Sequence, residues 1–379
     1  MTPKAWILGA ALAASAAAAS AQEEKLLRQM VDFSGTIGFL GAGAPGFVIA
    51  AVAGGESAAA GFGETAAGSG RTPDGGTLMR IGSISKAFCG VVLADMAAKG
   101  ELALTDPLSA RSGLGVPIPE RGGRTLRLLD LATQTSGLPR EVPQAPMPPD
   151  DPFGGNTPEA QKAGLAGDPL LFPPGTGALY SNWGFDLLGE ALAHTAGKPY
   201  AALLAERVFA PAGMTATRFD LPPELRAEAM QGHFFDGAPM PFVPTPATIQ
   251  CAGGLYSSAD DMTAWMRWLL DRSEDAAAET RAIDRAGWVW RDGLSPVSGL
   301  DDGGGDMDAM GLGWVIRLPE GNMPLTINKT GGLQGVFSYV ILAPERGVGV
   351  FAAMNKFDVG GFSVMVETAE GLLRDLAPR

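Results

Sequence analysis

A serine and a lysine three positions apart are the first residues of the chain that could do covalent chemistry. Ser83 and Lys86 open a segment whose apolar residues recur at helical spacing. Residues at i and i+3 share one face of a helix, so the Lys86 amine can contact the Ser83 hydroxyl and accept its proton. The backbone N–H of a serine at a helix start can also help to bind an oxyanion. The pair predicts a serine nucleophile with a lysine base; a surface lysine at chance spacing is the alternative.

A tyrosine and an asparagine, Tyr180 and Asn182, stand where a long loop gives way to a second helical pattern. A phenol can relay a proton to and from a serine, and an amide can hold a substrate carbonyl. The chain has only 4 tyrosines, so chance rarely supplies this pair. The alternative interpretation is a core aromatic followed by Ser181 as a helix cap.

A third set, Lys329-Thr330-Gly331 followed by Gly332, ends a predicted strand. A cation at a strand edge can hold a carboxylate, and bare glycines let a substrate backbone lie alongside as an added strand. A simple turn after the strand is the alternative. Chance would supply all three sets together on the order of once in a thousand such chains, so their combination predicts a catalytic site.

The periodicity of apolar residues predicts the elements that must position these groups. They are a hairpin over residues 47–63, helices over 83–100, 183–196 and 257–269, strands over 325–330, 337–342 and 348–354, and a terminal helix over 362–376. Residues 138–177 are rich in Pro and Gly and predict ordered surface loops. Because the hairpin and the strands lie at opposite ends of the chain, we expect both ends to build one antiparallel sheet.

Composition excludes several other kinds of protein. The 379 residues are 46% hydrophobic and 18% charged, which is typical of a folded chain. The formal net charge of −13 and the absence of a basic run argue against a nucleic-acid partner. His194, His233, Cys89 and Cys251 fit no zinc spacing, and the acidic segment 301–308 lacks the closing Glu of a calcium loop. We therefore expect no metal and no cofactor.

The first 21 residues have the pattern of a secretory signal peptide. A short positive start and an uncharged apolar run over residues 5–18 precede the small residues Ala19 and Ala21, and Gln22 would begin the mature chain. A retained N-terminal anchor is the alternative. No later stretch approaches ~18 uncharged apolar residues, so we expect no stable membrane span after cleavage.

In their order along the chain, the three motifs resemble the signature of the serine β-lactamase/penicillin-binding protein superfamily. The middle motif opens with a tyrosine, Tyr180, and in this it is similar to the class C-like branch of the superfamily. The stretches RIGSISKAF, LATQTSGLPRE, YSNWGFDLLGEALAHTAGKPY and NKTGGLQGVFSYV most resemble AmpH-type D-alanyl-D-alanine carboxypeptidase/endopeptidases. The resemblance implies an α/β (α+β) fold, in which an antiparallel sheet flanked by helices joins a mostly helical subdomain. One hydrolase domain would span 22–379, with its sheet from about 22–80 and 310–379 and the helical subdomain over about 100–250.

The resemblance also implies a role for each motif residue. Ser83 would be acylated by the penultimate D-Ala carbonyl of a peptidoglycan stem peptide, while Lys86 and Tyr180 transfer protons. The remaining roles are substrate binding by Asn182, Lys329, Thr330 and Gly331, and an oxyanion hole formed by the backbone N–H groups of Ser83 and Gly332. A lysine with an ordinary pKa of ~10.4 is a poor base at neutral pH, so burial or a nearby cation such as Lys329 must lower the pKa of Lys86.

Two departures from the class C pattern favour a periplasmic peptidase that β-lactams acylate. Asn328 and Gly332 flank the Lys-Thr-Gly motif where many class C enzymes have His and Ser, and the Asn-rich segment that follows is reduced to residues 355–357. These changes put fast β-lactam deacylation in doubt. A class C-like β-lactamase or promiscuous esterase is the first alternative, and a penicillin-binding sensor without turnover is the second.

The pairing of the two cysteines stays open. Cys89 lies on the expected nucleophile helix, and Cys251 precedes a Gly253-Gly254 segment that in the resembled family runs near that helix. An oxidising periplasm would allow a disulfide, and two separate buried thiols are equally compatible with the sequence.

Overall fold

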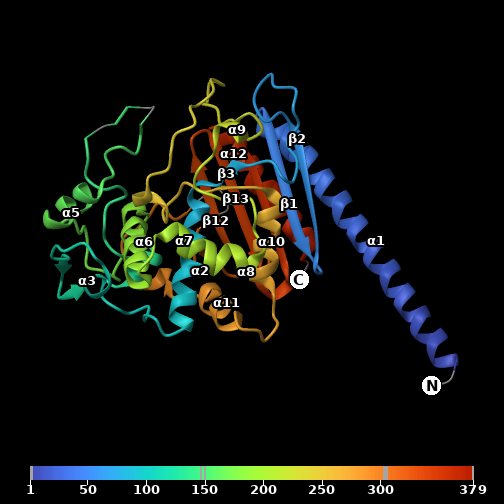
Figure 1. Ribbon diagram of the computed structural model, residues 1–379, viewed down its shortest axis with the longest axis horizontal. Helices are drawn as coiled ribbons and strands as arrows, with labels where there is room; N and C mark the ends of the chain where they lie inside the picture. The colour runs from blue at the N-terminus through green and yellow to red at the C-terminus, as the bar shows by residue number, and fades with distance from the viewer. Residues whose placement is uncertain (1–2, 146, 149–150, 302–305, 378–379) are drawn as a thin grey trace.

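An eight-stranded antiparallel sheet forms the centre of the molecule (Figure 1). The computed structural model describes residues 3–145, 147–148, 151–301 and 306–377, with side chains from residue 21 onward. In sheet order the strands are β2 (Glu56–Gly63), β1 (Gly46–Ala53), β14 (Val348–Met354), β13 (Val336–Ala343), β12 (Thr326–Leu333), β11 (Val315–Arg317), β10 (Ala309–Met310) and β8 (Val289–Trp290). Phe47 of β1 lies opposite Met354 of β14, so the two ends of the chain meet in one sheet, as predicted.

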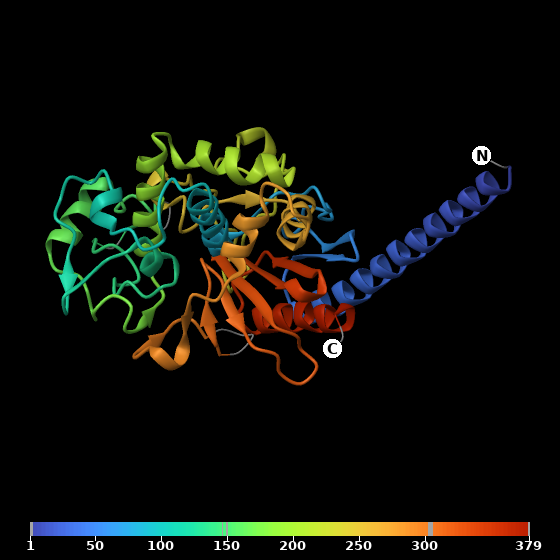
Figure 2. The ribbon, with the colours of Figure 1, turned by 90° about the horizontal axis from the view of Figure 1, so that it is seen from below.

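Helices cover both faces of the sheet. They are α1 (Pro3–Ala42) and α12 (Val359–Leu376) on one face, and α2 (Ser85–Ala98) and α10 (Ala259–Leu270) on the other (Figure 2). Successive residues of a strand point to opposite faces, and β1 is apolar on both. Phe47 and Ile49 pack toward α1 and α12, whereas Val48 and Ala50 pack toward α2 and α10. The sheet is thus a buried middle layer that holds the edge of β12 against the start of α2.

Between β2 and β8, helices joined by long irregular segments outnumber strands, and β9 (Val297–Ser298) follows β8. The further helices are α3 (Leu108–Arg111), α4 (Leu128–Ala132), α5 (Pro158–Ala166), α6 (Asn182–Ala196), α7 (Tyr200–Leu204), α8 (Ala210–Ala212), α9 (Pro223–Arg226) and α11 (Ala278–Arg285). The short strands are β3 (Met79–Arg80), β4 (Glu120–Arg121), β5 (Arg124–Thr125), β6 (Ala178–Leu179), β7 (Tyr256–Ser257) and β9 (Val297–Ser298). Figure 1 shows α3, α5 and α6 gathered on the side of the molecule away from α1.

Two local predictions need adjustment. The hairpin predicted over residues 47–63 turns within only two residues, because Gly54 and Gly55 both adopt positive φ, 59° and 87°, which glycine tolerates and which closes a tight hairpin. Helix α5 lies inside the segment predicted to be loops. Thr157 is its N-cap, and the Thr157 side chain accepts a hydrogen bond from Ala160 N. The helix buries only Gln161 and Leu165. So short and polar a helix leaves little periodicity in the sequence.

Residues 22–42, which the sequence analysis grouped with the sheet, are helical. They form the second half of α1, where Leu27 and Val31 pack into the core under β1. The first half of α1 extends away from the rest of the molecule, and the predicted cleavage point after Ala21 falls within this helix (Figure 1). Within the described part of the chain, no helix is both long and apolar enough to cross a membrane.

Residues 302–305 of the acidic segment 301–308 lie outside the described residues. Asp301, at its start, forms an ion pair with Arg291, whose Nη1 lies 2.6 Å from the Asp301 carboxylate.

Candidate active site

The serine and lysine of the first motif lie where the chain enters α2. Ser83 is the middle residue of a 3₁₀ turn, Gly82–Ile84, and α2 itself begins two residues later at Ser85. Lys86 is in the first turn of α2 and has no exposed surface. The Lys86 Nζ atom lies 3.3 Å from Ser83 Oγ, within reach for proton transfer once a substrate draws the two groups together.

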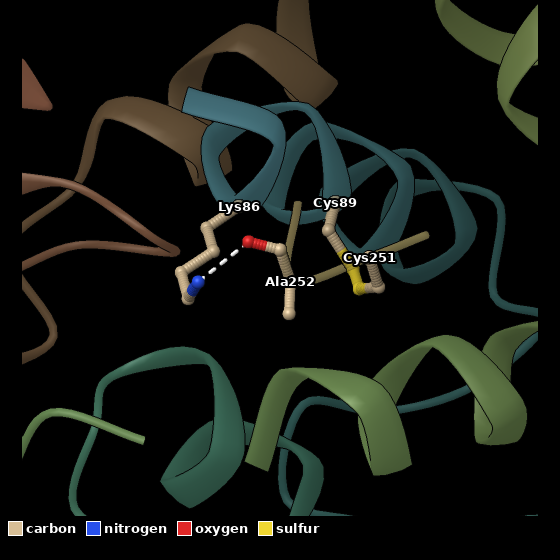
Figure 3. The surroundings of a disulfide bond; sticks show 4 residues. All are labelled: Lys86, Cys89, Cys251 and Ala252. Carbon is tan, nitrogen blue, oxygen red and sulfur yellow. Dashed lines mark hydrogen bonds between the residues drawn. A yellow bond between two sulfur atoms is a disulfide. The ribbon is translucent and has the colours of Figure 1, made fainter. Parts of the chain in front are cut away.

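Two acceptors fix the orientation of the Lys86 amine. The Nζ atom donates to Asn182 Oδ1 at 2.7 Å. It also donates to the Ala252 carbonyl at 2.6 Å (Figure 3). A neutral amine has two N–H donors and one lone pair. If both donors are used by these acceptors, the lone pair is left to face Ser83 Oγ, which is the arrangement that a general base requires.

Tyr180 lies between two lysines. The Nζ atoms of Lys86 and Lys329 are 5.0 and 5.2 Å from the centre of its ring. Loss of hydration alone would raise the pKa of Tyr180, but the charges of Lys329 and Lys86 outweigh it and lower the pKa to about 7. A phenol with such a pKa can both accept and return a proton near neutral pH.

The pKa of Lys86 is lowered in the way that the sequence analysis required. Burial is the main cause, since a fully buried ammonium loses its hydration, and the nearby charge of Lys329 lowers the pKa further. Tyr180 and Asp186 act in the opposite direction. Lys86 is therefore a better base than a lysine in water.

The third motif runs along β12 beside the serine. Lys329 Nζ donates to the Thr330 carbonyl at 2.9 Å, and Gly331 and Gly332 follow it on the strand. On one side β12 pairs with β13 over its whole length; on the other, β11 reaches only residues 326–328. No strand among the described residues pairs with the second edge of 329–333. An extended peptide could add there as a further strand.

Glycines allow the serine turn to approach β12 closely. Gly82 has a φ of +51°, and a Cβ on it would lie 2.6 Å from Gly332 N. Only glycine fits this position, both for its left-handed backbone and for its contact with β12. The close approach sets the residue before Ser83 against Gly332, so the two predicted oxyanion-hole N–H groups belong to neighbouring backbone segments.

A cavity of about 300 Å³ opens beside Ser83 and Gly332, and Arg140, Glu141, Phe153 and Asn182 contribute to its wall. The structure thus brings Ser83, Asn182 and Gly332 to one cavity. Lys329 and Thr330 line a smaller adjoining recess with Tyr180.

The sequence motifs did not identify three polar neighbours of these residues. Glu141 accepts from Asn182 Nδ2 at 2.5 Å, so both ends of the Asn182 amide have partners. Gln134 is buried, and its side-chain Oε1 accepts from Ser181 N at 2.6 Å. Glu141 and Gln134 both lie in the stretch LATQTSGLPRE, which resembles the AmpH-type enzymes. Nothing in the types or spacing of the two residues predicts these contacts.

Asp186, one turn after Asn182 on α6, is the third. Its carboxyl group is buried, and Asn156 Nδ2 donates to one oxygen at 2.7 Å. Burial raises the pKa of Asp186 to about 8, although the Asn156 hydrogen bond and the Lys86 charge both oppose the shift. At neutral pH the carboxyl is thus mostly protonated, which limits how far it can raise the pKa of Lys86.

The two cysteines, whose pairing the sequence leaves open, are bonded to each other. Cys89 and Cys251 form a disulfide with a Cα–Cα distance of 5.5 Å, next to Lys86 and Ala252 (Figure 3). Within the described residues, no group of three or more His, Cys, Asp or Glu side chains is arranged to hold a metal ion.

Comparisons with known proteins match nearly the whole chain. The sequence model of the β-lactamase family matches residues 24–370. The chain is 32% identical to the D-alanyl-D-alanine-carboxypeptidase/endopeptidase AmpH of Escherichia coli K12, over 98% of this chain and 95% of that protein. It is 27% identical to a β-lactamase of Pseudomonas fluorescens, over 74% of this chain and 80% of the other.

A solved structure confirms the predicted fold. The β-lactamase/D-alanine carboxypeptidase of Yersinia pestis superposes with a TM-score of 0.83 at 33% identity, covering 93% of this chain and 98% of the other.

Proposed function

The chain belongs to the β-lactamase family, and we propose that it is a serine peptidase that cleaves D-alanyl-D-alanine bonds of peptidoglycan stem peptides. The bond cut would be that of a free stem peptide, of a cross-link, or of both. Ser83 would carry the acyl-enzyme. The similarity to AmpH over almost the full length of both chains supports the substrate class.

The convergence of Ser83, Lys86 and Tyr180 is the observation that carries the proposal. A buried lysine 3.3 Å from the serine, and a phenol close to the Nζ atoms of both Lys86 and Lys329, are suited to moving the serine proton. In the proposed acylation, Ser83 Oγ attacks the penultimate D-Ala carbonyl while its proton passes to Lys86 or Tyr180. The C–N bond then breaks, and the leaving amine takes a proton from the same groups.

The substrate would lie along the free edge of β12. Its terminal carboxylate would meet Lys329 and Thr330, Gly331 would leave room for its backbone, and Asn182 would hold the acyl side. The N–H groups of Ser83 and Gly332 would bind the oxyanion; losing one such donor commonly lowers the rate by ~10²–10³.

We also propose that the protein works in the periplasm. Residues 1–21 would be removed on export, which would leave one hydrolase domain over residues 22–379. The disulfide supports an oxidising compartment, because such bonds persist there and are rare in the cytosol. N-terminal sequencing of secreted protein would test the cleavage, with Gln22 as the expected first residue.

Digestion of defined muropeptides tests the substrate. The mature protein and its Ser83→Ala variant are incubated with pentapeptide monomers and with cross-linked dimers, and the products are identified by mass spectrometry. We expect loss of one D-Ala, or of the cross-link, with the wild type alone. Substantial turnover by Ser83→Ala would contradict the mechanism, and no change in either substrate would contradict the substrate class.

Hydrolysis of β-lactams is the second candidate. It is favoured by the match to the P. fluorescens β-lactamase, and the same serine would be acylated by the lactam carbonyl. Rapid turnover of nitrocefin without cleavage of either peptide would select this function. Stoichiometric labelling by penicillin without product release would instead indicate a sensor.

A further inference from the structure

The disulfide joins the two segments that hold the Lys86 amine. Cys89 follows Lys86 by three residues on α2, one helical turn away on the same face. Its partner Cys251 immediately precedes Ala252, whose carbonyl accepts from Lys86 Nζ at 2.6 Å (Figure 3). Although 162 positions separate the cysteines in sequence, the bond joins the helix of Lys86 to the residue before Ala252.

Few other polar contacts hold the Ala252 carbonyl in place. Residues 250–255 form no regular element, and Gly253 N donates only to Ile249 O within the same segment, at 2.9 Å. Among the hydrogen bonds of the described residues, those from 251–253 to α2 are limited to the Lys86 contact itself. Beyond residue 253 the segment is held to the residues that precede α2, since Arg80 Nη1 donates to Gly254 O at 2.6 Å and Ile81 N donates to Leu255 O at 3.0 Å. At Ala252 itself, the disulfide one residue earlier is the covalent restraint that links this carbonyl to α2.

We propose that the Cys89–Cys251 disulfide is a positioning device for Lys86, so that the acylation rate of Ser83 depends on the redox state of the bond. Reduction by a dithiol cleaves the S–S bond with two electrons and two protons, giving two thiols and an oxidised dithiol. The segment that carries Ala252 then moves relative to α2, and Lys86 loses a fixed acceptor. The inference rests on the proposed function only in taking Ser83 as the nucleophile.

The loss of one acceptor changes what the amine can do. Lys86 is fully buried, and a buried donor that loses its acceptor is costly to leave unpaired. The freed N–H then turns toward Ser83 Oγ, which lies 3.3 Å away, and the lone pair turns away from the hydroxyl whose proton it must take. A misplacement of this kind in a catalytic group commonly costs about tenfold to a hundredfold in rate.

Acylation by a fluorescent penicillin, followed in time, tests the inference. We compare oxidised protein, protein reduced with dithiothreitol, and the double variant Cys89→Ala/Cys251→Ala, and alkylation with mass spectrometry counts the free thiols. Reduction should lower the acylation rate constant about tenfold or more. The acylation rate constant of the double variant should be equally low and should not change when reductant is added. The pH dependence of acylation should shift with reduction, because Lys86 changes its hydrogen bonds.

A control separates positioning from loss of stability. Val92→Ala shortens a buried side chain on the next turn of α2 and leaves both cysteines in place. It should lower the melting temperature yet acylate at the wild-type rate with an unchanged pH profile. Reduced protein that is folded, has two free thiols and acylates at the oxidised rate would overturn the inference, as would a Val92→Ala variant that is equally slow.

A second substrate distinguishes failure of this inference from failure of the proposed function. If penicillin does not label the oxidised protein, the same comparison is made by hydrolysis of an uncharged thioester. Thioester turnover that reduction slows would support the inference even if every peptide is left intact. No acylation of Ser83 by either probe would contradict both the inference and the nucleophile.

Discussion

Lys329 sets the protonation of two other residues of the site. Its charge lowers the pKa of Tyr180, against the effect of lost hydration, and adds to the lowering of the pKa of Lys86 that burial begins. A base must be unprotonated to act, so a lower pKa extends activity toward acid pH. Removal of the Lys329 charge would raise both pKa values and confine activity to more alkaline solutions.

The variant Lys329→Met should therefore shift the acid limb of the pH profile of kcat/KM. In the wild type we expect this limb near the Tyr180 pKa of about 7, and in the variant about one unit higher. An uncharged thioester is the substrate, so that lost carboxylate binding does not contribute. Lys198→Met, at a lysine that pairs with Glu206, is the control and should leave the limb unchanged. An identical limb in Lys329→Met would show that Lys329 does not tune the site.

At the scale of elements, the turn after α4 holds the strand and helix that flank Tyr180. Gln134 accepts from Leu179 N through its backbone carbonyl at 2.9 Å and from Ser181 N through its side chain at 2.6 Å. Gln134 thus forms hydrogen bonds with the residues on both sides of Tyr180. Its φ of 62° is unusual for a residue with a side chain and costs energy that the fold must supply.

Two substitutions at Gln134 separate the hydrogen bond from the backbone strain. Gln134→Gly and Gln134→Ala both lose the acceptor for Ser181 N, and both should lower kcat/KM about tenfold by loosening Tyr180. Glycine adopts positive φ freely, so Gln134→Gly should be about 1 kcal/mol more stable than Gln134→Ala in denaturant unfolding. A kcat/KM of Gln134→Gly near that of the wild type, with a lower value only in the less stable Gln134→Ala, would show that the side-chain hydrogen bond has no role.

The same elements show what the sequence could and could not predict. Ser83 and Lys86 lie three residues apart and the β12–β14 strands are consecutive, so local spacing sufficed to predict their contacts. Gln134 and Ala252 act on residues about 45 and 165 positions away through contacts that only the assembled fold creates. The disulfide stayed open for the same reason, because two cysteines so far apart can be paired or separate in the same core.

At the scale of the whole molecule, buried acids make stability depend on pH. Asp284 of α11 has no exposed surface, and Trp314 Nε1 donates to one of its oxygens at 3.1 Å. Burial raises the pKa of Asp284 to about 8, although the Trp314 hydrogen bond opposes the shift. Between about pH 4 and pH 8 the folded protein keeps a proton that the unfolded chain releases. Its contribution to stability is therefore full in acid and is lost as the pH rises through 8.

The variant Asp284→Asn should flatten this dependence. The amide oxygen can still accept from Trp314, and no charge has to be buried at high pH. We expect its melting temperature to exceed that of the wild type by several degrees at pH 9 and by little at pH 5. Asp292→Asn, at an exposed aspartate, is the control and should change neither value. Equal shifts of Asp284→Asn at both pH values would refute the buried-acid explanation.

The site joins distant parts of the chain, since Gly82 before Ser83 lies directly against Gly332 of β12. We expect this assembly to make Ser83 a nucleophile. Peptide mapping by mass spectrometry after incubation with benzylpenicillin tests this expectation. We predict one acyl group, located on Ser83, in the wild type, and none in Ser83→Ala or nearly none in Lys86→Ala. An acyl group on any other residue, or equal labelling of Ser83→Ala, would contradict this expectation.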